Sequence, residues 1–346
     1  MRVGINGMGR IGRAVLRHLW LDGIDSVIHV NDPQPTAENL AYLVKYDSVY
    51  GRFPGDVEVN SDGLLLGDSS RQWLVSVSHD ASITDVDWVA VAADVVIEAS
   101  GVDANARSGR AVVAAGVPYV VITQASPYAE ATVVFGANEE ALTGATRIFA
   151  TNTCDAVAIA PVLRALLAAG PVESVFLVTL HPWLSYQNLS DGPVQWVAES
   201  LPSFGDMALG RASVGAIIPK TTTAARCVES VLPRLTGRIT GMSYRVPTPV
   251  VCYCHLVVRF TADVTLDLVR QHLHASSPHL RISGEPVVSV DLIGEMASAV
   301  IDSRFIEQVG DRSIRLSLGY DNEWGFAARV RDLVAHLRKR LEDAVQ

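Results

Sequence analysis

The 346-residue sequence contains no apolar run close to the ~18 residues that a membrane-spanning helix requires. It has only three lysines and a net charge of −9, which argues against a general nucleic-acid surface because such a surface needs a basic face. Hydrophobic residues make up 49% of the chain and charged residues 19%, which is typical of a folded globular protein. The N-terminus reads directly as a strand, without the layout of a signal peptide. We therefore predict a cytoplasmic protein.

Cysteine is scarce as well. The four cysteines are Cys154, Cys227, Cys252 and Cys254. The last two alternate along a strand-like run and should point to the same face of a sheet. No second pair of ligands with zinc-like spacing accompanies them, so we predict reduced thiols and no bound metal.

The first 32 residues carry the clearest pattern in the chain. A strand over 2–6 leads into the glycine-rich segment Gly7–Gly12, and an amphipathic helix over 13–19 follows. A second apolar strand over 26–31 ends at Asp32, about 20 residues after the last glycine. This order of strand, glycine turn, helix, strand and acid predicts a dinucleotide-binding unit.

Each part of that unit has a physical task. Gly7 permits the tight turn, Gly9 lets the backbone approach a pyrophosphate, and Gly12 lets the helix pack closely on the strand. The pyrophosphate would lie at the helix N-terminus. Asp32 would accept hydrogen bonds from ribose hydroxyls and repel a 2′-phosphate, which predicts NAD.

Strands and helices alternate up to residue 150, which predicts a parallel α/β domain. One buried strand ends in Ser100 and Gly101, and the next ends at Thr123. Small residues at the carboxyl ends of parallel strands are where a cofactor passes in such sheets.

The second half has a different character. A long strand over 172–181 ends in His181, and a loop over 184–210 follows. Further strand-like runs predict a large, mostly antiparallel sheet, and they cover 239–246, 249–259, 285–292, 298–304 and 313–318. A final amphipathic helix covers about 322–344.

Cys154 opens an apolar helical run, with Asn152 or Thr153 as the N-cap. The N–H groups and partial positive charge of a helix N-terminus stabilise a thiolate, which is the nucleophilic form of cysteine. Taken alone, the pattern also fits an inert buried cysteine.

The chain resembles glyceraldehyde-3-phosphate dehydrogenases from end to end. Several blocks carry the resemblance in one order and spacing, and they are 6–13, 31–33, 46–53, Cys154, His181, 191–193, 217–219, 235–248 and 320–326.

The resemblance implies an α/β Rossmann-type NAD-binding domain plus an α+β catalytic domain with a large mostly antiparallel sheet. We expect the first domain to cover 1–150, with the C-terminal helix 322–346 packing back on it, and the second to cover 151–321. The resemblance further implies a homotetramer that acts on a small-molecule aldehyde.

The resemblance also assigns roles to residues. Cys154 is the expected nucleophile and His181 the base that pairs with its thiolate. Asn322 matches the residue that holds the nicotinamide carboxamide, and Arg245 matches a phosphate-binding arginine. The expected cofactor-binding residues are Gly7, Gly9, Arg10, Ile11, Gly12, Asp32, Ser100, Gly101, Thr123 and Asn322. The expected substrate-binding residues are Thr153, Asp155, Lys220, Thr222, Thr223 and Arg245.

The departures from the family pattern concern phosphate. Asp155 replaces a threonine beside the nucleophile, and its charge should repel phosphate and raise the Cys154 pKa. Leu184 and Tyr186 stand where threonines bind the substrate phosphate. Lys220 would supply a replacement cation, pair with Asp155, or lie in solvent.

Three functions are compatible with these residues. The first is an NAD-dependent aldehyde dehydrogenase of this family with a different aldehyde or acyl acceptor. The second is an ordinary phosphorylating glyceraldehyde-3-phosphate dehydrogenase. The third is an NAD-binding homologue with a regulatory or binding role.

Overall fold

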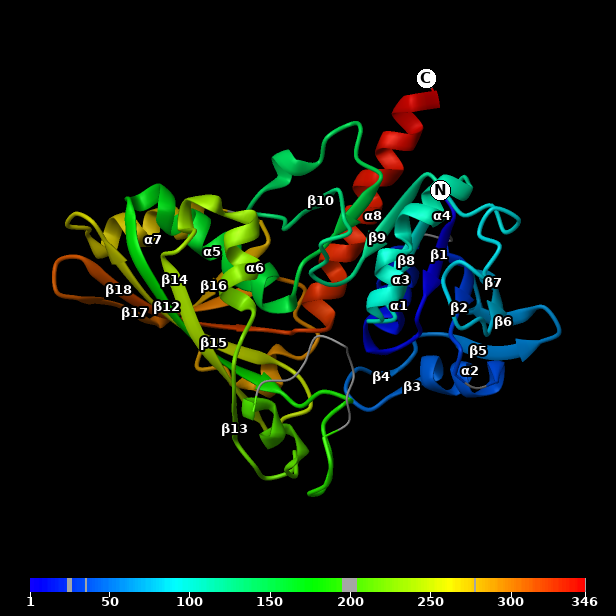
Figure 1. The fold of residues 1–346 in the computed structure, drawn as a ribbon, viewed down its shortest axis with the longest axis horizontal. Coiled ribbons are helices and arrows are strands. Elements are labelled where there is room, and N and C mark those ends of the chain that lie inside the picture. Colours follow the sequence, from blue (N-terminus) through cyan, green and yellow to red (C-terminus); the bar gives the residue numbers. More distant parts are fainter. Residues whose placement is uncertain (24–26, 35, 195–203, 277, 346) are drawn as a thin grey trace. The chain divides into compact units, whose positions relative to one another are not determined.

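The computed structural model describes residues 1–23, 27–34, 36–194, 204–276 and 278–345. The chain divides into two compact units. Unit 1 comprises 1–133, 140–152 and 327–346, and unit 2 comprises 134–139 and 153–326. Each unit is built around its own sheet (Figure 1).

The sheet of unit 1 has the order β10-β11-β9-β8-β1-β2-β7-β6-β5 among the described residues. Its strands are β1 (Val3–Asn6), β2 (Val27–Asn31), β5 (Asp56–Asn60), β6 (Gly63–Gly67), β7 (Gln72–Ser78), β8 (Val95–Glu98), β9 (Tyr119–Ile122), β10 (Ala131–Thr132) and β11 (Ile148–Ala150). Its helices are α1 (Arg10–Leu21), α2 (Ala37–Lys45), α3 (Asp103–Arg107) and α4 (Gly109–Ala115), and a small hairpin pairs β3 (Tyr46–Asp47) with β4 (Gly51–Arg52).

The pairs from β10 to β7 are parallel, which confirms the Rossmann-type core. At one edge of this mostly parallel sheet, β5, β6 and β7 form an antiparallel meander that the sequence did not indicate. Short connections between these strands permit hairpins, whereas parallel pairing would need a longer crossover.

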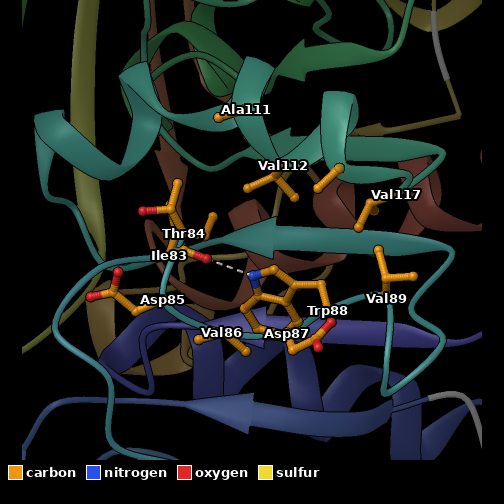
Figure 2. A pocket seen from close by; sticks show the side chains of 11 residues that line it. Ile83, Thr84, Asp85, Val86, Asp87, Trp88, Val89, Ala111, Val112 and Val117 are labelled. Atoms are coloured by element: carbon orange, nitrogen blue, oxygen red, sulfur yellow. Dashed lines mark hydrogen bonds between the residues drawn. The ribbon is translucent and has the colours of Figure 1, made fainter.

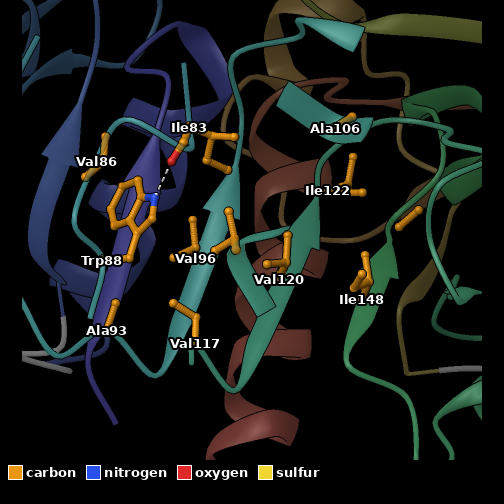
Figure 3. Close-up of a cluster of buried hydrophobic side chains, with 12 residues drawn as sticks. Ile83, Val86, Trp88, Ala93, Val96, Ala106, Val117, Val120, Ile122 and Ile148 are labelled. Carbon is orange, nitrogen blue, oxygen red and sulfur yellow. Dashed lines mark hydrogen bonds between the residues drawn. The ribbon is translucent and has the colours of Figure 1, made fainter. Parts of the chain in front are cut away.

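A cluster of buried apolar side chains supports the central strands of unit 1. Figure 3 shows Trp88, Val96, Val120 and Ile148 succeeding one another across this part of the sheet. The Trp88 indole N–H donates to the Ile83 carbonyl at 2.8 Å, so the buried ring leaves no polar atom unsatisfied.

The sheet of unit 2 has the order β13-β14-β12-β15-β18-β17-β16 among the described residues. Its strands are β12 (Val172–Pro182), β13 (Ile218–Lys220), β14 (Ile239–Val246), β15 (Cys252–Phe260), β16 (Leu280–Ser283), β17 (Ala299–Val309) and β18 (Ser313–Tyr320). Its helices are α5 (Cys154–Ala169), α6 (Ala224–Val231) and α7 (Leu266–Ala275), with 3₁₀ turns η2 (Phe204–Gly210), η3 (Pro233–Leu235) and η4 (Ser289–Leu292), while the turn η1 (Glu139–Ala141) spans the boundary between the two units. Most pairs are antiparallel, as predicted, while β12/β14 and β16/β17 are parallel.

The strand predicted over 285–292 is wrong. The Asp291 carboxylate accepts a hydrogen bond from the Val288 N–H at 2.8 Å, and this local bond closes the 3₁₀ turn η4. The strand of this region is β16, which pairs with β17.

The last helix, α8 (Trp324–Val345), begins in unit 2, and its residues from 327 onward group with unit 1. Part of the predicted 184–210 loop, 195–203, lies outside the described residues. None of the described helices combines the length and apolarity needed to cross a membrane.

Candidate active site

The glycine loop between β1 and α1 contains glycines that the fold requires and one, Gly9, that it does not. A Cβ on Gly12 would lie 2.0 Å from the Gly7 carbonyl oxygen, and Gly7 itself has a φ of +95°. The fold therefore requires glycine at both positions. A Cβ on Gly9 would meet nothing within 4 Å. Open space at Gly9 suits a bound pyrophosphate, so the loop fits the dinucleotide that the sequence predicts.

Asp32 follows β2 and holds this loop. Its carboxylate accepts a hydrogen bond from the Met8 N–H at 2.7 Å and another from the Gln34 N–H at 2.9 Å. Arg10, in the first turn of α1, forms an ion pair with Asp47.

A buried polar network joins the carboxyl ends of β2, β1 and β8. The Asn31 amide donates to Asn6 at 2.7 Å, and the Asn6 amide donates to Glu98. The Ser100 N–H and hydroxyl both donate to Glu98, and the Thr123 hydroxyl donates to the Glu98 carbonyl at 3.0 Å. Burial raises the Glu98 pKa.

Sequence reasoning found Ser100 and Thr123 but missed Glu98. An acid inside an apolar strand was the available signal, since such a residue is rarely buried without partners. Gly101 follows the network with a φ of +71°. Ile11 lies in the first turn of α1.

In unit 2, Cys154 is the first residue of α5. Thr153 is the N-cap, and its hydroxyl accepts a hydrogen bond from the Ala156 N–H at 3.3 Å. Cys154 remains partly exposed, while the apolar side chains after it are buried. The predicted helix start is confirmed.

His181 lies close to Cys154 although 27 residues separate them. The distance from Cys154 Sγ to His181 Nε2 is 3.7 Å. His181 Nδ1 lies 2.8 Å from the Pro182 carbonyl oxygen, which can only accept a hydrogen bond. The proton of the neutral ring is therefore on Nδ1, and the Nε2 lone pair faces the sulfur.

Asp155 is 8% exposed and faces inward. Its Oδ1 accepts a hydrogen bond from the Tyr320 hydroxyl at 2.6 Å, and Cys154 Sγ lies 3.9 Å from the same oxygen. The partner that the structure gives Asp155 is thus Tyr320, at the end of β18.

The electrostatics favour uncharged partners in the resting protein. Burial raises the Cys154 pKa well above its usual value, and the charge of Asp155 acts in the same direction, as the sequence predicted. Burial and the charge of Arg245 lower the His181 pKa to about 4. These shifts favour a thiol beside a neutral imidazole, because burial opposes the stabilisation that a helix N-terminus gives to a thiolate.

Arg245 lies beside His181, since the two are register partners on β14 and β12. Its Nη2 donates to the Tyr186 hydroxyl at 3.1 Å. Its Nε is buried and has no hydrogen-bond partner among the described residues. Because buried donors are normally satisfied, this N–H fits an anionic group of a substrate. Leu184 contributes no hydroxyl to this region.

The remaining predicted substrate residues gather around α6. Lys220 ends β13, and its charge lowers the His181 pKa. Thr222 accepts a hydrogen bond from the Ala224 N–H at 3.1 Å, and Thr223 is the N-cap residue of α6. Burial raises the pKa of the Cys227 thiol. Hydrogen bonds between this thiol and the hydroxyls of Thr153 and Thr223 act in the opposite direction.

Asn322 follows β18 and is buried. Its Oδ1 accepts a hydrogen bond from the Val251 N–H at 3.0 Å. Val251 has a φ of +72°, which is strained for a β-branched residue and typical of functional regions. The bond orients the Asn322 amide so that its NH₂ group points away from Val251.

Two further features lie outside the chemistry of the site. Cys252 and Cys254 are free thiols, both buried on one face of β15, as predicted. A hollow of about 390 Å³ in unit 1 is lined by residues of 83–89 and 111–117, including Trp88 (Figure 2). None of the predicted site residues lines it.

The Asp155–Tyr320 hydrogen bond can be tested by stability. We expect Tyr320→Phe to lower the free energy of unfolding by about 1–3 kcal/mol, because it leaves a buried carboxylate oxygen without its donor. Urea denaturation measures the loss. Tyr42→Phe is the control, since Tyr42 is 61% exposed. Equal stability of both variants would contradict a stabilising Asp155–Tyr320 bond.

The comparisons with known proteins agree with this geometry. Two family models match the chain. "Glyceraldehyde 3-phosphate dehydrogenase, NAD binding domain" matches residues 1–106, and "Glyceraldehyde 3-phosphate dehydrogenase, C-terminal domain" matches residues 153–322.

Curated relatives extend over nearly the whole chain. The chain is 34% identical to glyceraldehyde-3-phosphate dehydrogenase 1 of Schizosaccharomyces pombe, over 97% of each protein. It is 34% identical to the cytosolic glyceraldehyde-3-phosphate dehydrogenase of Chondrus crispus, over 98% of each. It is 35% identical to glyceraldehyde-3-phosphate dehydrogenase 1 of Candida glabrata, over 98% of this chain and 99% of that relative. This chain therefore belongs to the glyceraldehyde-3-phosphate dehydrogenase family, and NAD is its cofactor.

Proposed function

We propose that the protein oxidises an aldehyde through a covalent adduct on Cys154, and that its aldehyde or its acyl acceptor differs from that of an ordinary phosphorylating glyceraldehyde-3-phosphate dehydrogenase. The observation that carries the proposal is the arrangement at Cys154. The sulfur lies 3.7 Å from a neutral imidazole nitrogen and 3.9 Å from a carboxylate oxygen.

The first step is addition of Cys154 Sγ to the aldehyde carbon. His181 Nε2 takes the thiol proton as a new C–S bond forms, and the proton passes to the carbonyl oxygen to give a thiohemiacetal. N–H groups at the start of α5 stabilise the negative charge that develops on that oxygen.

NAD, when bound, supplies a hydride acceptor. His181 takes the hydroxyl proton of the thiohemiacetal as the hydride leaves, and the carbon becomes a thioester. An acceptor then attacks the thioester carbon and the C–S bond breaks, which returns the Cys154 thiol. Water is the simplest uncharged acceptor: once His181 has released its proton to solvent, it can take a proton from water and return it to the Cys154 sulfur as the C–S bond breaks, which leaves a carboxylic acid.

We assign the cofactor to the glycine loop and Asp32, with Arg10, Ile11, Ser100, Gly101 and Thr123 around it and Asn322 as the carboxamide partner. Open space at Gly9 supports this assignment. On the substrate side, the buried Nε of Arg245 supports an anionic group on the aldehyde. Thr153, Lys220, Thr222 and Thr223 would complete the substrate pocket.

Asp155 argues against phosphate as the acyl acceptor. A phosphate that attacks a thioester on Cys154 would bring its charge to about 5 Å from the carboxylate. Repulsion at that distance costs roughly 1–3 kcal/mol per unit charge at effective dielectrics between that of bulk water and that of a near-surface site. An uncharged acceptor avoids this cost.

Two alternatives remain candidates. Arg245 and Lys220 favour an ordinary phosphorylating glyceraldehyde-3-phosphate dehydrogenase, because both can offset phosphate charge. An NAD-binding homologue with a regulatory role would not need a thiol and an imidazole in contact. The short distance between Cys154 and His181 argues against it.

One experiment separates these functions. NADH formation is measured with glyceraldehyde 3-phosphate, with and without phosphate or arsenate, and with a panel of other aldehydes. The proposal predicts turnover that does not require phosphate and that disappears in Cys154→Ser. Phosphate-dependent turnover of glyceraldehyde 3-phosphate at an ordinary enzymatic rate would refute it. Absence of turnover on the whole panel would favour the binding homologue.

Replacing Asp155 tests the role of its charge. We expect Asp155→Thr to raise the ratio of turnover with phosphate to turnover without it by about 5- to 160-fold, as removal of roughly 1–3 kcal/mol of repulsion requires. Asp267→Asn is the matched control, because Asp267 occupies the same position in the first turn of α7 after a threonine N-cap. An unchanged ratio in Asp155→Thr would show that the carboxylate does not exclude phosphate.

We further propose that the NAD-binding domain covers 1–150 with the C-terminal helix 322–346, and that the catalytic domain covers 151–321. The compact units lend support to this division. A cytoplasmic homotetramer is the assembly we propose for the protein, by analogy with its family.

A further inference from the structure

Three side chains of different chemistry offer ligand atoms to one point in unit 2. Cys154 Sγ, a carboxylate oxygen of Asp155 and a ring nitrogen of His181 all lie within 4.8 Å of one another. The sulfur is 3.7 Å from His181 Nε2 and 3.9 Å from Asp155 Oδ1. Tetrahedral Zn²⁺ with bonds of about 2.0–2.3 Å places its ligand atoms roughly 3.3–3.6 Å apart. The two distances from the sulfur exceed this range by only a few tenths of an ångström, and the three atoms come to zinc-binding separation if the triangle contracts from sides of at most 4.8 Å.

The neighbours of these atoms already have the arrangement that a metal requires. A ligating histidine usually donates its other N–H to a carbonyl or carboxylate, and a ligating carboxylate is usually hydrogen-bonded as well. Here His181 Nδ1 donates to the Pro182 carbonyl oxygen, and the Tyr320 hydroxyl donates to Asp155 Oδ1. Both ligands are held in place before any metal arrives.

The charges and the chemical types of these three ligands favour one kind of cation over others. A thiolate and a carboxylate together offset the charge of a divalent ion, although the nearby Arg245 opposes it. The combination of sulfur, imidazole nitrogen and one carboxylate oxygen suits Zn²⁺, whereas Mg²⁺ and Ca²⁺ prefer oxygen ligands alone. Cys154 is partly exposed, so the fourth position is open to water.

We propose that Cys154, Asp155 and His181 form a reversible inhibitory site for Zn²⁺. Binding replaces the thiol proton, which is released to solvent, with a Zn–S bond, and it engages the Nε2 lone pair. The site itself stands on geometry alone, while its inhibitory effect rests on the proposed function. Sequence reasoning considered a metal only near Cys252 and Cys254 and gave Asp155 no such role.

The test is equilibrium dialysis of the full chain against ZnCl₂ under reducing conditions. We expect one Zn²⁺ per chain in the wild type and in Asp267→Asn. Asp155→Asn should weaken the affinity at least tenfold, and Cys154→Ser should weaken it further. Asparagine keeps an oxygen acceptor for Tyr320, and circular dichroism checks that each variant is folded. Co²⁺ provides a second readout, because it gives a thiolate charge-transfer band only when Cys154 binds the metal.

The outcomes are separable. Equal Zn²⁺ affinity in wild type and Asp155→Asn would overturn the three-ligand site, and one bound Zn²⁺ in Cys154→Ser at unchanged affinity would place the metal elsewhere. Dialysis needs no aldehyde, so a protein without dehydrogenase activity that still binds Zn²⁺ through these residues would refute the proposed function and leave the site intact. Zn²⁺ that binds in this way without inhibiting an active enzyme would overturn the inhibitory effect.

Discussion

Replacing His181 with asparagine is expected to lower kcat by about 10²- to 10⁴-fold, the usual contribution of a positioned general base. The imidazole is the group whose lone pair faces Cys154 Sγ at 3.7 Å, and its low pKa, about 4, keeps it neutral and able to accept a proton at physiological pH. Asparagine can occupy the end of β12 but cannot accept a proton. Steady-state NADH formation at saturating aldehyde and NAD measures the loss.

The control for this prediction is His255→Asn. His255 is also a strand histidine of the same sheet, on β15, where its register partners are Val178 on β12 and Ser317 on β18. We expect its kcat to stay within about twofold of wild type. The affinity of His181→Asn for NAD, measured by quenching of tryptophan fluorescence, should also stay close to wild type. A kcat loss below tenfold in His181→Asn would mean that another group accepts the proton.

The parts of the site that the sequence predicted depend on local chain geometry. Gly7, Gly12 and Asp32 follow from the turn and packing needs of a single strand-helix-strand unit. Cys154 follows from an N-cap and an apolar helical pattern. The prediction that His181 lies near Cys154 did not follow from local geometry, because it depends on how β12 runs beside α5. Only the resemblance to a family indicated that the two residues meet.

The partners of buried polar groups were not predictable in this way. Asp155 and Tyr320 are 165 residues apart, and neither helix nor strand periodicity indicates that they meet. The hydrogen bond from Asn6 to Glu98 joins residues 92 apart in the sequence, and it was unpredictable for the same reason. Sequence reasoning therefore gave Asp155 a role toward phosphate and Lys220, whereas the fold places a phenol against it. The effect of Asp155 on the Cys154 pKa was predictable from the sequence, but the larger effect of burial was not, because the extent of burial is a property of the assembled unit.

A large loss of stability is also expected for one variant of the glycine loop, Gly12→Ala. Comparison with Gly9→Ala distinguishes an effect on folding from an effect on cofactor binding. We expect Gly12→Ala to lower the free energy of unfolding by about 3 kcal/mol or more, because overpacking is most costly when the opposing atom is backbone. The new Cβ would lie 2.0 Å from the Gly7 carbonyl oxygen. Gly7 cannot shift easily, since its own φ of +95° suits glycine alone. Urea denaturation of the purified chain measures the change.

Gly9→Ala is the matched partner of that variant, three residues away in the same loop. Gly9 is the N-cap residue of α1, and its Cβ would meet no protein atom within 4 Å, so we expect the free energy of unfolding to change by less than about 1 kcal/mol, the cost of a poorer N-cap. The KM for NAD should nevertheless rise at least tenfold, because the methyl group would occupy the space through which the pyrophosphate approaches the backbone. A stable Gly9→Ala protein with the wild-type KM for NAD would show that nothing needs that space, and the cofactor would then have to lie elsewhere than on this loop.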